Sequence, residues 1–161
     1  MVTRVVSKVD VAEAAERFAG VIPPSPLQRN ERLSARYDLD VWLKREDLNA
    51  VRSYKGRGAF NFISVLSADA RARGVVCASA GNHAQGVAFA CASLGVKATV
   101  YLPRTTPRQK RDRVAALGGR HVTVVVETPR GIDARIQELF RELARLLPEP
   151  PRGALRRQEP R

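Results

Sequence analysis

The second half of the chain alternates short apolar runs with longer stretches whose apolar residues recur at helical spacing. The short runs are rich in valine, which is typical of buried parallel strands. The longer stretches begin near capping residues or end at glycines, as helices of globular proteins do. The pattern predicts strands at 75–78, 98–101 and 122–126, and helices at 59–73, 84–94, 107–117 and 133–147, the third of them capped by Thr106.

Strands and helices that alternate with short, glycine-marked connections predict an α/β fold. We expect an open, mostly parallel twisted sheet with helices on both faces. In such sheets, ligands bind at the carboxyl ends of the strands. The loops that directly follow the predicted strands are therefore the first places to search for a site.

The first 51 residues are less regular. Asp10 is expected to cap a helix that runs to Phe18. Three prolines between residues 23 and 26 exclude a helix there and predict an extended connection. Residues 41–44 form a short apolar run that predicts a strand.

Length and composition fit one globular domain. The chain has 161 residues, of which 44% are hydrophobic and 27% charged, so a disordered or collagen-like chain is not expected. No stretch approaches the roughly 20 apolar residues of a membrane-spanning helix, and residues 1–10 lack the pattern of a secretory signal. Cys77 and Cys91 lack the spacing of a zinc site or a disulfide framework. We therefore expect a cytoplasmic protein without membrane contact.

The chain is strongly basic. It has 28 lysines and arginines against 16 aspartates and glutamates, a formal net charge of +12. Such a charge raises the possibility of nucleic-acid binding. However, the basic residues are mostly arginines, they are spread along the whole chain, and they are mixed with acids. No element combines basic with aromatic residues, so we favour a general arginine bias over a nucleic-acid interface.

Two segments carry candidate chemistry. In the first, Lys55 stands at the mouth of a predicted helix between Tyr54 and a glycine. The positive helix end and the neighbouring Arg52 and Arg57 favour the uncharged amine, which is the form that Schiff-base chemistry needs. From local features alone, a solvated lysine in a loop remains the alternative.

The second segment, 79–86, follows a predicted strand and opens a helix. Its small residues let the backbone approach a ligand, and the N–H groups of the helix start form an anion site. Asn82 adds a side-chain donor and acceptor. The alternative is a tight turn capped by Ser79 or Asn82, with His83 as a surface or structural histidine.

Together, these segments resemble the β-family (fold type II) of pyridoxal-phosphate enzymes, and within it most closely the threonine dehydratases, or threonine ammonia-lyases. The resemblance covers residues 41–126 and fades beyond them. The residues that carry it are Lys44-Arg45-Glu46-Asp47-Leu48, Ser53-Tyr54-Lys55, Arg57-Gly58-Ala59, Ser79 to Gly86, Tyr101-Leu102-Pro103, Thr106-Pro107 and Lys110.

The resemblance implies a cofactor, a substrate and roles. Lys55 would attach pyridoxal 5'-phosphate covalently and later remove the substrate's α-proton. Tyr54 would pack near the pyridine ring, and Asn82 would hydrogen-bond the cofactor's phenolic oxygen. The substrate, threonine or serine, would leave as 2-oxobutanoate or pyruvate with ammonia. Its carboxylate would be bound by Ser79, Ala80, Gly81, Asn82 and His83.

The resemblance also implies how the chain is divided. Residues 1–51 would be an arm that belongs with a large domain, with apolar surface exposed around 41–43. Residues 52–147 would be the small α/β domain. Residues 148–161, rich in proline and arginine, are expected to be a disordered and non-native tail.

Two departures from the family concern activity. Gly56 stands where the family has a bulkier apolar residue, and no glycine-rich phosphate loop follows Gly119. We therefore expect an N-terminal portion of a cytoplasmic, homo-oligomeric threonine dehydratase of isoleucine synthesis or threonine breakdown, inactive alone. The alternative is a non-catalytic α/β fragment that binds an amino-acid carboxylate or a partner subunit.

Overall fold

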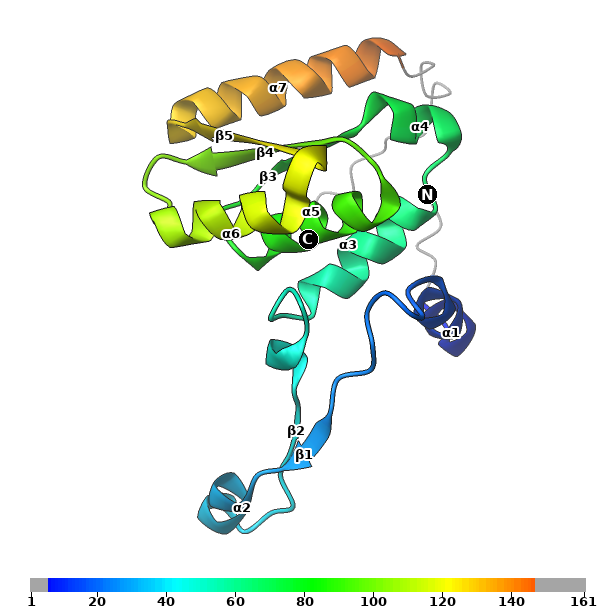
Figure 1. Cartoon of the computed structure of the whole chain (residues 1–161), viewed down its shortest axis with the longest axis vertical. Helices are drawn as coiled ribbons and strands as arrows, with labels where there is room; N and C mark the ends of the chain where they lie inside the picture. Colours follow the sequence, from blue (N-terminus) through cyan, green and yellow to red (C-terminus); the bar gives the residue numbers. More distant parts are fainter. Residues whose placement is uncertain (1–5, 147–161) are drawn as a thin grey trace, which may run out of the picture.

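The computed structural model describes residues 6–146, in which a three-stranded parallel sheet is covered by helices and a two-stranded arm extends away from it (Figure 1). The strands are β1 (Leu27–Arg29), β2 (Trp42–Lys44), β3 (Val75–Ala78), β4 (Ala98–Pro103) and β5 (Val122–Glu127). The helices are α1 (Lys8–Arg17), α2 (Glu31–Tyr37), α3 (Lys55–Ser64), α4 (Ala68–Arg73), α5 (Asn82–Leu94), α6 (Arg108–Gly118) and α7 (Pro129–Leu146), with single 3₁₀ turns η1 (Glu46–Leu48) and η2 (Gly119–His121).

The parallel sheet has the strand order β3-β4-β5. Helices α5 and α6 cover one face together with α3, and α7 crosses the other face (Figure 1). The expected α/β class, with a mostly parallel sheet and helices on both faces, is confirmed.

The core lies between the central strand and α5. Val100 and Leu102 on β4 are fully buried. Side chains alternate along the strand, so these two point to the α5 side and their neighbours face α7. Helix α5 meets them with small residues, among them Ala84, Ala88 and Cys91, none of which is exposed. Small side chains let α5 lie close to both the sheet and α3, so burial here extends to the start of α3.

Helix α1 begins earlier than Asp10. Ser7 is the N-cap, and its hydroxyl accepts a hydrogen bond from the N–H of Asp10. Asp10 returns the contact by accepting from the N–H of Ser7 at 2.8 Å. Asp10, the expected cap, is therefore the third residue of the helix. With Ser7 it forms a capping box, a reciprocal arrangement in which each side chain accepts from a free backbone N–H group.

The helix predicted at 59–73 is two helices. The first, α3, starts four residues earlier, at Lys55, and ends at Ser64. Ser67 then caps α4 by accepting from the N–H of Ala70 at 3.2 Å. A serine hydroxyl competes with helix continuation wherever it can cap a following turn, which explains the break.

Other differences lie at element ends. Thr106 does not cap α6; Pro107 occupies the N-cap position, and Thr106 is buried with a hydroxyl that has no hydrogen-bond partner among the described residues. Helix α7 begins at Pro129, four residues before the predicted start. Residue 147, the predicted end of that helix, and the tail 148–161 lie outside the described residues.

The arm contains two elements that the pattern did not predict, β1 and α2. β1 pairs antiparallel with β2, with Leu27 opposite Lys44. Asn30 caps α2 by accepting from the N–H of Leu33 at 2.9 Å. Trp42 on β2 is 52% exposed, as expected for apolar surface around 41–43, whereas Val41 and Leu43 are half-buried.

Candidate active site

Lys55 is the first residue of α3, directly after Tyr54 at the N-cap position. The backbone N–H of Lys55 donates to the Ser53 hydroxyl at 3.3 Å. Its ammonium lies 4.8 Å from the centroid of the Tyr54 ring, a cation–π contact. Among the described residues this ammonium forms no hydrogen bond or ion pair. It is therefore available to a ligand.

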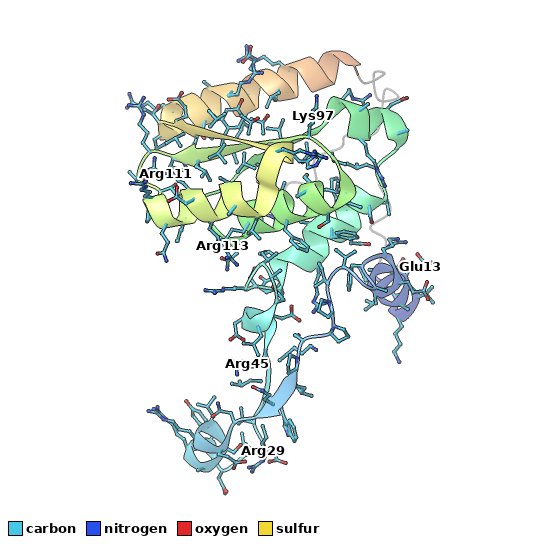
Figure 2. All side chains as sticks on the ribbon, viewed as in Figure 1. Glu13, Arg29, Arg45, Lys97, Arg111 and Arg113 are labelled. Carbon is cyan, nitrogen blue, oxygen red and sulfur yellow. The ribbon has the colours of Figure 1, made fainter. Side chains whose placement is uncertain are left out.

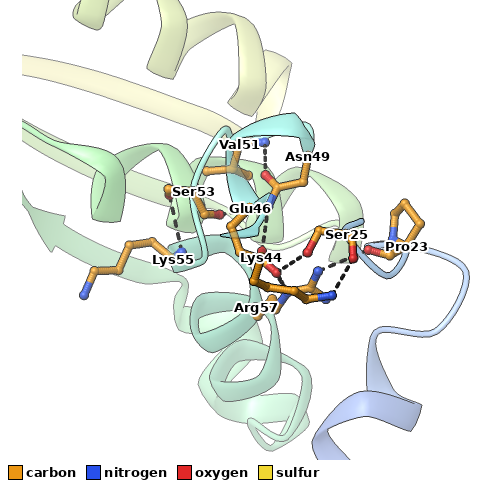
Figure 3. Close-up of polar contacts among 9 residues, drawn as sticks. All are labelled: Pro23, Ser25, Lys44, Glu46, Asn49, Val51, Ser53, Lys55 and Arg57. Carbon is orange, nitrogen blue, oxygen red and sulfur yellow. Dashed lines mark hydrogen bonds and ion pairs between the residues drawn. The ribbon is translucent and has the colours of Figure 1, made fainter. Parts of the chain in front are cut away.

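The turn before Lys55 is fixed by the side chain of Asn49 (Figure 3). Its amide nitrogen donates to the backbone oxygen of Ser53 at 3.0 Å and to Glu46 at 2.9 Å. Its amide oxygen accepts from the N–H of Val51 at 2.9 Å. One side chain therefore satisfies three groups of the loop that leads into the lysine.

Glu46 links this turn to α3 and to the proline-rich connection. Arg57 donates from Nε to both carboxylate oxygens of Glu46, at 3.0 and 3.1 Å, and Ser25 donates its hydroxyl at 2.6 Å. Arg57 also donates to the backbone oxygen of Pro23 at 3.1 Å. Arg57 was expected to add positive charge beside Lys55; instead its charge is compensated by Glu46.

The surroundings of Glu46 shift the pKa of its carboxyl group. Burial by itself would raise the pKa of this carboxyl. The hydrogen bonds from Arg57 and Ser25 outweigh burial and, with the charge of Arg57 and the amide of Asn49, hold the pKa of Glu46 below its ordinary value. The carboxylate is thus the stable form, and the network that it centres stays intact at neutral pH.

The packing around position 56 explains why a glycine stands there. A Cβ at this position would lie 3.0 Å from Cγ2 of Val51 and 3.8 Å from Cδ1 of Ile22. Val51 and Ile22 are both buried, so they occupy the space that a larger side chain at position 56 would need. The departure from the family pattern is therefore compensated by neighbouring side chains.

The second segment forms the connection from β3 to α5. Residues 79–81 are the loop, and Asn82 and His83 begin the helix. Gly81 is the N-cap and no side chain caps the helix. The segment is a tight strand-to-helix turn, but the expected cap by Ser79 or Asn82 is wrong. Ser79 instead accepts from the N–H of Gly81 at 3.3 Å, which shapes the loop and leaves the N–H groups of the first turn of α5 uncapped.

Gly86 brings the two segments together. A Cβ on Gly86 would lie 2.9 Å from the carbonyl carbon and oxygen of Lys55 and 3.1 Å from the nitrogen of Gly56. These contacts are closer than a real Cβ tolerates, so only glycine allows α5 to cross α3 at this point. The sequence showed a glycine here, but not which backbone it approaches.

A groove of about 390 Å³ begins at this crossing. Tyr54, Lys55 and His83 form its polar end, and the rest is lined by apolar residues of α3, β3 and α5. Of the other predicted site residues, Ser79, Ala80, Gly81 and Asn82 do not line the groove. They lie on the loop and helix start, beside His83.

The two cysteines do not add a reactive site. Burial raises the pKa of the Cys77 thiol, and burial together with Cys77 that of Cys91, each to about 11, so both are unreactive at neutral pH. Both are free thiols. Within residues 6–146 no group of histidine, cysteine, aspartate or glutamate is arranged to hold a metal. No helix in the same range is long and apolar enough to cross a membrane.

The basic residues are distributed over the whole molecule. Arg29 and Arg45 lie on the arm, Arg111 and Arg113 on α6, and Lys97 on the connection from α5 to β4 (Figure 2). Arg29 pairs with Asp40 at 2.6 Å and Arg45 with Asp47 at 2.7 Å. Much of the positive charge on the arm is thus locally compensated.

Residues 18–154 match the protein family described as "Pyridoxal-phosphate dependent enzyme". The chain belongs to this family. The match extends beyond the 41–126 inferred from motifs and includes the segment that forms α7, where the resemblance was expected to have faded.

Curated relatives of the chain include threonine dehydratases. The chain is 55% identical over 121 residues to the biosynthetic L-threonine dehydratase of Mycobacterium leprae, covering 75% of this chain and 28% of that protein. It is 47% identical over 116 residues to the corresponding protein of Bacillus subtilis, covering 72% and 28%. The expected resemblance to threonine dehydratases is confirmed, and the chain spans less than a third of the length of these relatives.

Solved structures of two threonine deaminases and a serine racemase are similar to this chain. The processed form of threonine deaminase isoform 2 from Solanum lycopersicum has a TM-score of 0.67 at 37% identity, covering 85% of this chain and 41% of that one. A second threonine deaminase, from T.th., has a TM-score of 0.72 at 32% identity, covering 86% and 43%. Serine racemase from Dictyostelium discoideum has a TM-score of 0.75 at 27% identity, covering 86% and 45%.

The polar end of the groove fits the family's cofactor. It offers an uncompensated amine for the aldehyde and the Tyr54 ring for the flat pyridine. The apolar groove wall behind them suits an aromatic group, and the uncapped start of α5 suits an anionic one.

Proposed function

We propose that this chain carries the lysine and the loop of a pyridoxal-phosphate-dependent ammonia-lyase site that converts threonine to 2-oxobutanoate and ammonia. The observation that supports this most is the amine of Lys55 at the polar end of the groove, which contacts the Tyr54 ring and forms no hydrogen bond or ion pair within residues 6–146. The substrate class is supported by relatives named threonine dehydratase and threonine deaminase. Serine, with pyruvate as its product, is the second substrate of the proposal.

Bound pyridoxal phosphate supplies an electron sink for the charge left on the substrate when its α-proton is removed. Lys55 is proposed to hold the cofactor and, after the substrate amine has displaced it, to accept the α-proton at Nζ. The Tyr54 ring, 4.8 Å from that atom, is proposed to pack against the pyridine. The Glu46 network keeps the backbone that carries Lys55 in place.

The loop and the start of α5 are proposed to bind the substrate carboxylate. N–H groups at an uncapped helix start attract anions, and the helix dipole adds to this attraction. Ser79, Ala80, Gly81 and His83 surround this point, and Asn82 is proposed to donate a hydrogen bond to the phenolic oxygen of the cofactor. We further propose that the complete enzyme is a cytoplasmic homo-oligomer.

Reductive labelling tests the attachment of the cofactor. The purified chain is mixed with pyridoxal phosphate, reduced with borohydride, and digested for peptide mass spectrometry. Reduction fixes the pyridoxyl group on the lysine that carries it, so occupancy is read even where no stable visible band forms. We expect Lys55 to be labelled ahead of the other lysines, because its amine is exposed and no described residue forms a hydrogen bond or ion pair with it.

Two variants make the result specific. Lys55→Ala should remove the dominant label, and Lys97→Ala should leave it, because Lys97, labelled in Figure 2, is also exposed but does not line the groove. Equal labelling of all exposed lysines would overturn the proposal and leave the non-catalytic fragment as the better account.

A further inference from the structure

A second cavity lies at the edge of the sheet where the strands begin. Its volume is about 430 Å³, and Arg73, Arg120 and His121 line it. The described residues that it shares with the groove are Val75 and Val76, which belong to the apolar part of the groove. No aspartate or glutamate is among the described residues that line it. This cavity, the amino-edge pocket, is therefore separate from the polar end of the groove.

The strand topology brings the basic residues of the pocket together. The first residues of β3, β4 and β5 are in register, as parallel strands begin at the same edge of a sheet. Arg73 ends α4 just before β3, and Arg120 and His121 belong to the turn η2, just before β5. Figure 1 shows α4 at this edge, away from the tip of the β4 arrow. Residues that are far apart in the sequence therefore face one pocket.

Two glycines fix the segments that carry these residues. Gly74 has a φ of +87°, and a Cβ there would lie 2.9 Å from the backbone oxygen of Lys97. That oxygen accepts from the N–H of Val75 at 2.9 Å, so the end of α4 is held against the start of β4. A Cβ on Gly118 would lie 2.3 Å from Cβ of Val122, so the segment before η2 lies close to β5. Close packing of the backbone thus forms the pocket without a ligand.

The positive charge of the pocket is not compensated within residues 6–146. Arg73 and Arg120 form no ion pair with a described residue, whereas Arg45 and Arg57 each pair with a carboxylate. Arg120 instead donates from Nε to Nε2 of His121 at 3.5 Å. Positive groups that gather in a cleft without acids focus the electrostatic potential there and attract anions.

Two threonines add neutral groups to the pocket. Thr99 on β4 and Thr123 on β5 are register partners, and both line the pocket. A hydroxyl can donate to an oxyanion, and a guanidinium can donate two parallel hydrogen bonds to one. The donors come from α4, the sheet and η2, and so approach from three sides. This arrangement suits the tetrahedral oxygens of a phosphoryl group better than a planar carboxylate.

We propose that the amino-edge pocket binds a small phosphorylated anion. Arg73 and Arg120 bind the phosphoryl oxygens, with His121 and the two threonine hydroxyls beside them. A volume of about 430 Å³ leaves room beyond one phosphoryl group, so the ligand carries a second phosphate or a small organic part. The pocket lies apart from Lys55, so this ligand is not the substrate of the proposed reaction.

Binding of pyrophosphate to the isolated chain tests this proposal. It is measured by titration calorimetry at fixed ionic strength and without pyridoxal phosphate. Arg120→Gln removes one proposed contact, and Arg104→Gln removes the same charge from an exposed position after β4, outside the pocket. We expect Arg120→Gln to weaken binding at least about 10-fold and Arg104→Gln less than about twofold. Citrate, a carboxylate of similar charge, should bind at least about 10-fold more weakly than pyrophosphate.

The two histidines of the chain locate the ligand. His83 lines the groove and His121 lines the pocket. Pyrophosphate should shift the NMR signals of the His121 ring and leave those of His83 unchanged, and His121→Gln assigns the signals. Neither readout involves pyridoxal phosphate, so both are independent of labelling at Lys55.

Equal weakening by Arg120→Gln and Arg104→Gln, or citrate binding as tight as that of pyrophosphate, would overturn the proposal, because charge alone would then explain binding. A shift of the His83 signals instead of those of His121, an absence of pyrophosphate binding, or a chain without a cooperative unfolding transition would also overturn it. Tighter binding of a short single-stranded oligonucleotide than of pyrophosphate, at equal phosphate concentration, would replace the small anion with a nucleic acid and refute the proposal.

Discussion

Contacts of the neighbouring residues fix the backbone position of Lys55, and its own side chain does not contribute to this. Ser53 receives its N–H, Asn49 fixes Ser53, and Gly86 sets the distance to α5. The motif around the lysine could be found from the sequence, because its residue types carry chemistry. The support could not, because Glu46 and Arg57 are 11 residues apart and meet only after the turn has formed.

Glu46→Gln should change how stability depends on pH. The pKa of Glu46 is lower in the folded chain than its ordinary value of 4.5, so its contribution is present above pH 4.5 and is lost as pH falls through the folded pKa. Removal of the charge bonded to Arg57 should cost about 2 kcal/mol of unfolding free energy at pH 7, and less at lower pH. Urea unfolding at pH 7 and pH 4 measures this.

Asp47→Asn is the matched control for Glu46, since Asp47 pairs with Arg45 in an exposed position and exposed pairs contribute little. A pH profile of Glu46→Gln parallel to that of the unsubstituted chain would contradict the assigned role of Glu46.

Gly86→Ala should be destabilising although alanine favours helices. The added Cβ would meet the Lys55 carbonyl at 2.9 Å, and relief requires α5 to move off α3. We expect a loss of about 2 kcal/mol together with weaker pyridoxyl labelling of Lys55. Denaturant unfolding and peptide mass spectrometry provide the two readings.

Gly58→Ala provides the contrast, because nothing lies within 4 Å of its added Cβ. This change should leave stability equal or raise it by up to about 1 kcal/mol. A Gly86→Ala chain as stable as Gly58→Ala would mean that the helices do not meet as closely as described.

At the scale of elements, helices and strands with a regular local pattern could be predicted from the sequence. Elements that depend on a partner distant in the sequence could not. The strands at 75–78 and 122–126 follow from valine-rich runs and are confirmed, with β4 longer than predicted by two residues and β5 by one. β1, with three residues, exists because β2 pairs with it, and no local pattern indicates that. The break after Ser64 depends on one hydroxyl at Ser67, which also fits an exposed position within a longer helix.

Ser67→Ala tests the separation of α3 from α4. Loss of the hydroxyl that accepts from Ala70 should cost about 1 kcal/mol and should weaken amide protection across α4. Ser93→Ala, which removes a hydroxyl bonded to Phe89 within α5, should change little. Full retention of stability in Ser67→Ala would indicate that α4 does not depend on this cap.

At the scale of the whole molecule, the arm, the sheet and the groove meet at Lys55. The arm reaches α3 through the ion pair of Glu46 with Arg57, and α5 reaches it through Gly86. Trp42 on the arm and Phe62 beside the groove are exposed apolar surfaces. The sequence predicted the first of these surfaces, but the groove along β3 required knowledge of where α3 packs.

The central claim is that Lys55 performs the chemistry of threonine deamination. Turnover by a chimera, in which this chain replaces the matching part of the M. leprae threonine dehydratase, tests it most directly. Formation of 2-oxobutanoate from threonine is measured with pyridoxal phosphate for the chimera and for its Lys55→Ala and Lys97→Ala forms. We predict turnover by the chimera and by Lys97→Ala, and a loss of at least about 1,000-fold in Lys55→Ala. Turnover by Lys55→Ala at the rate of the parent chimera, or an inactive chimera that carries the pyridoxyl label on Lys55, would contradict the claim.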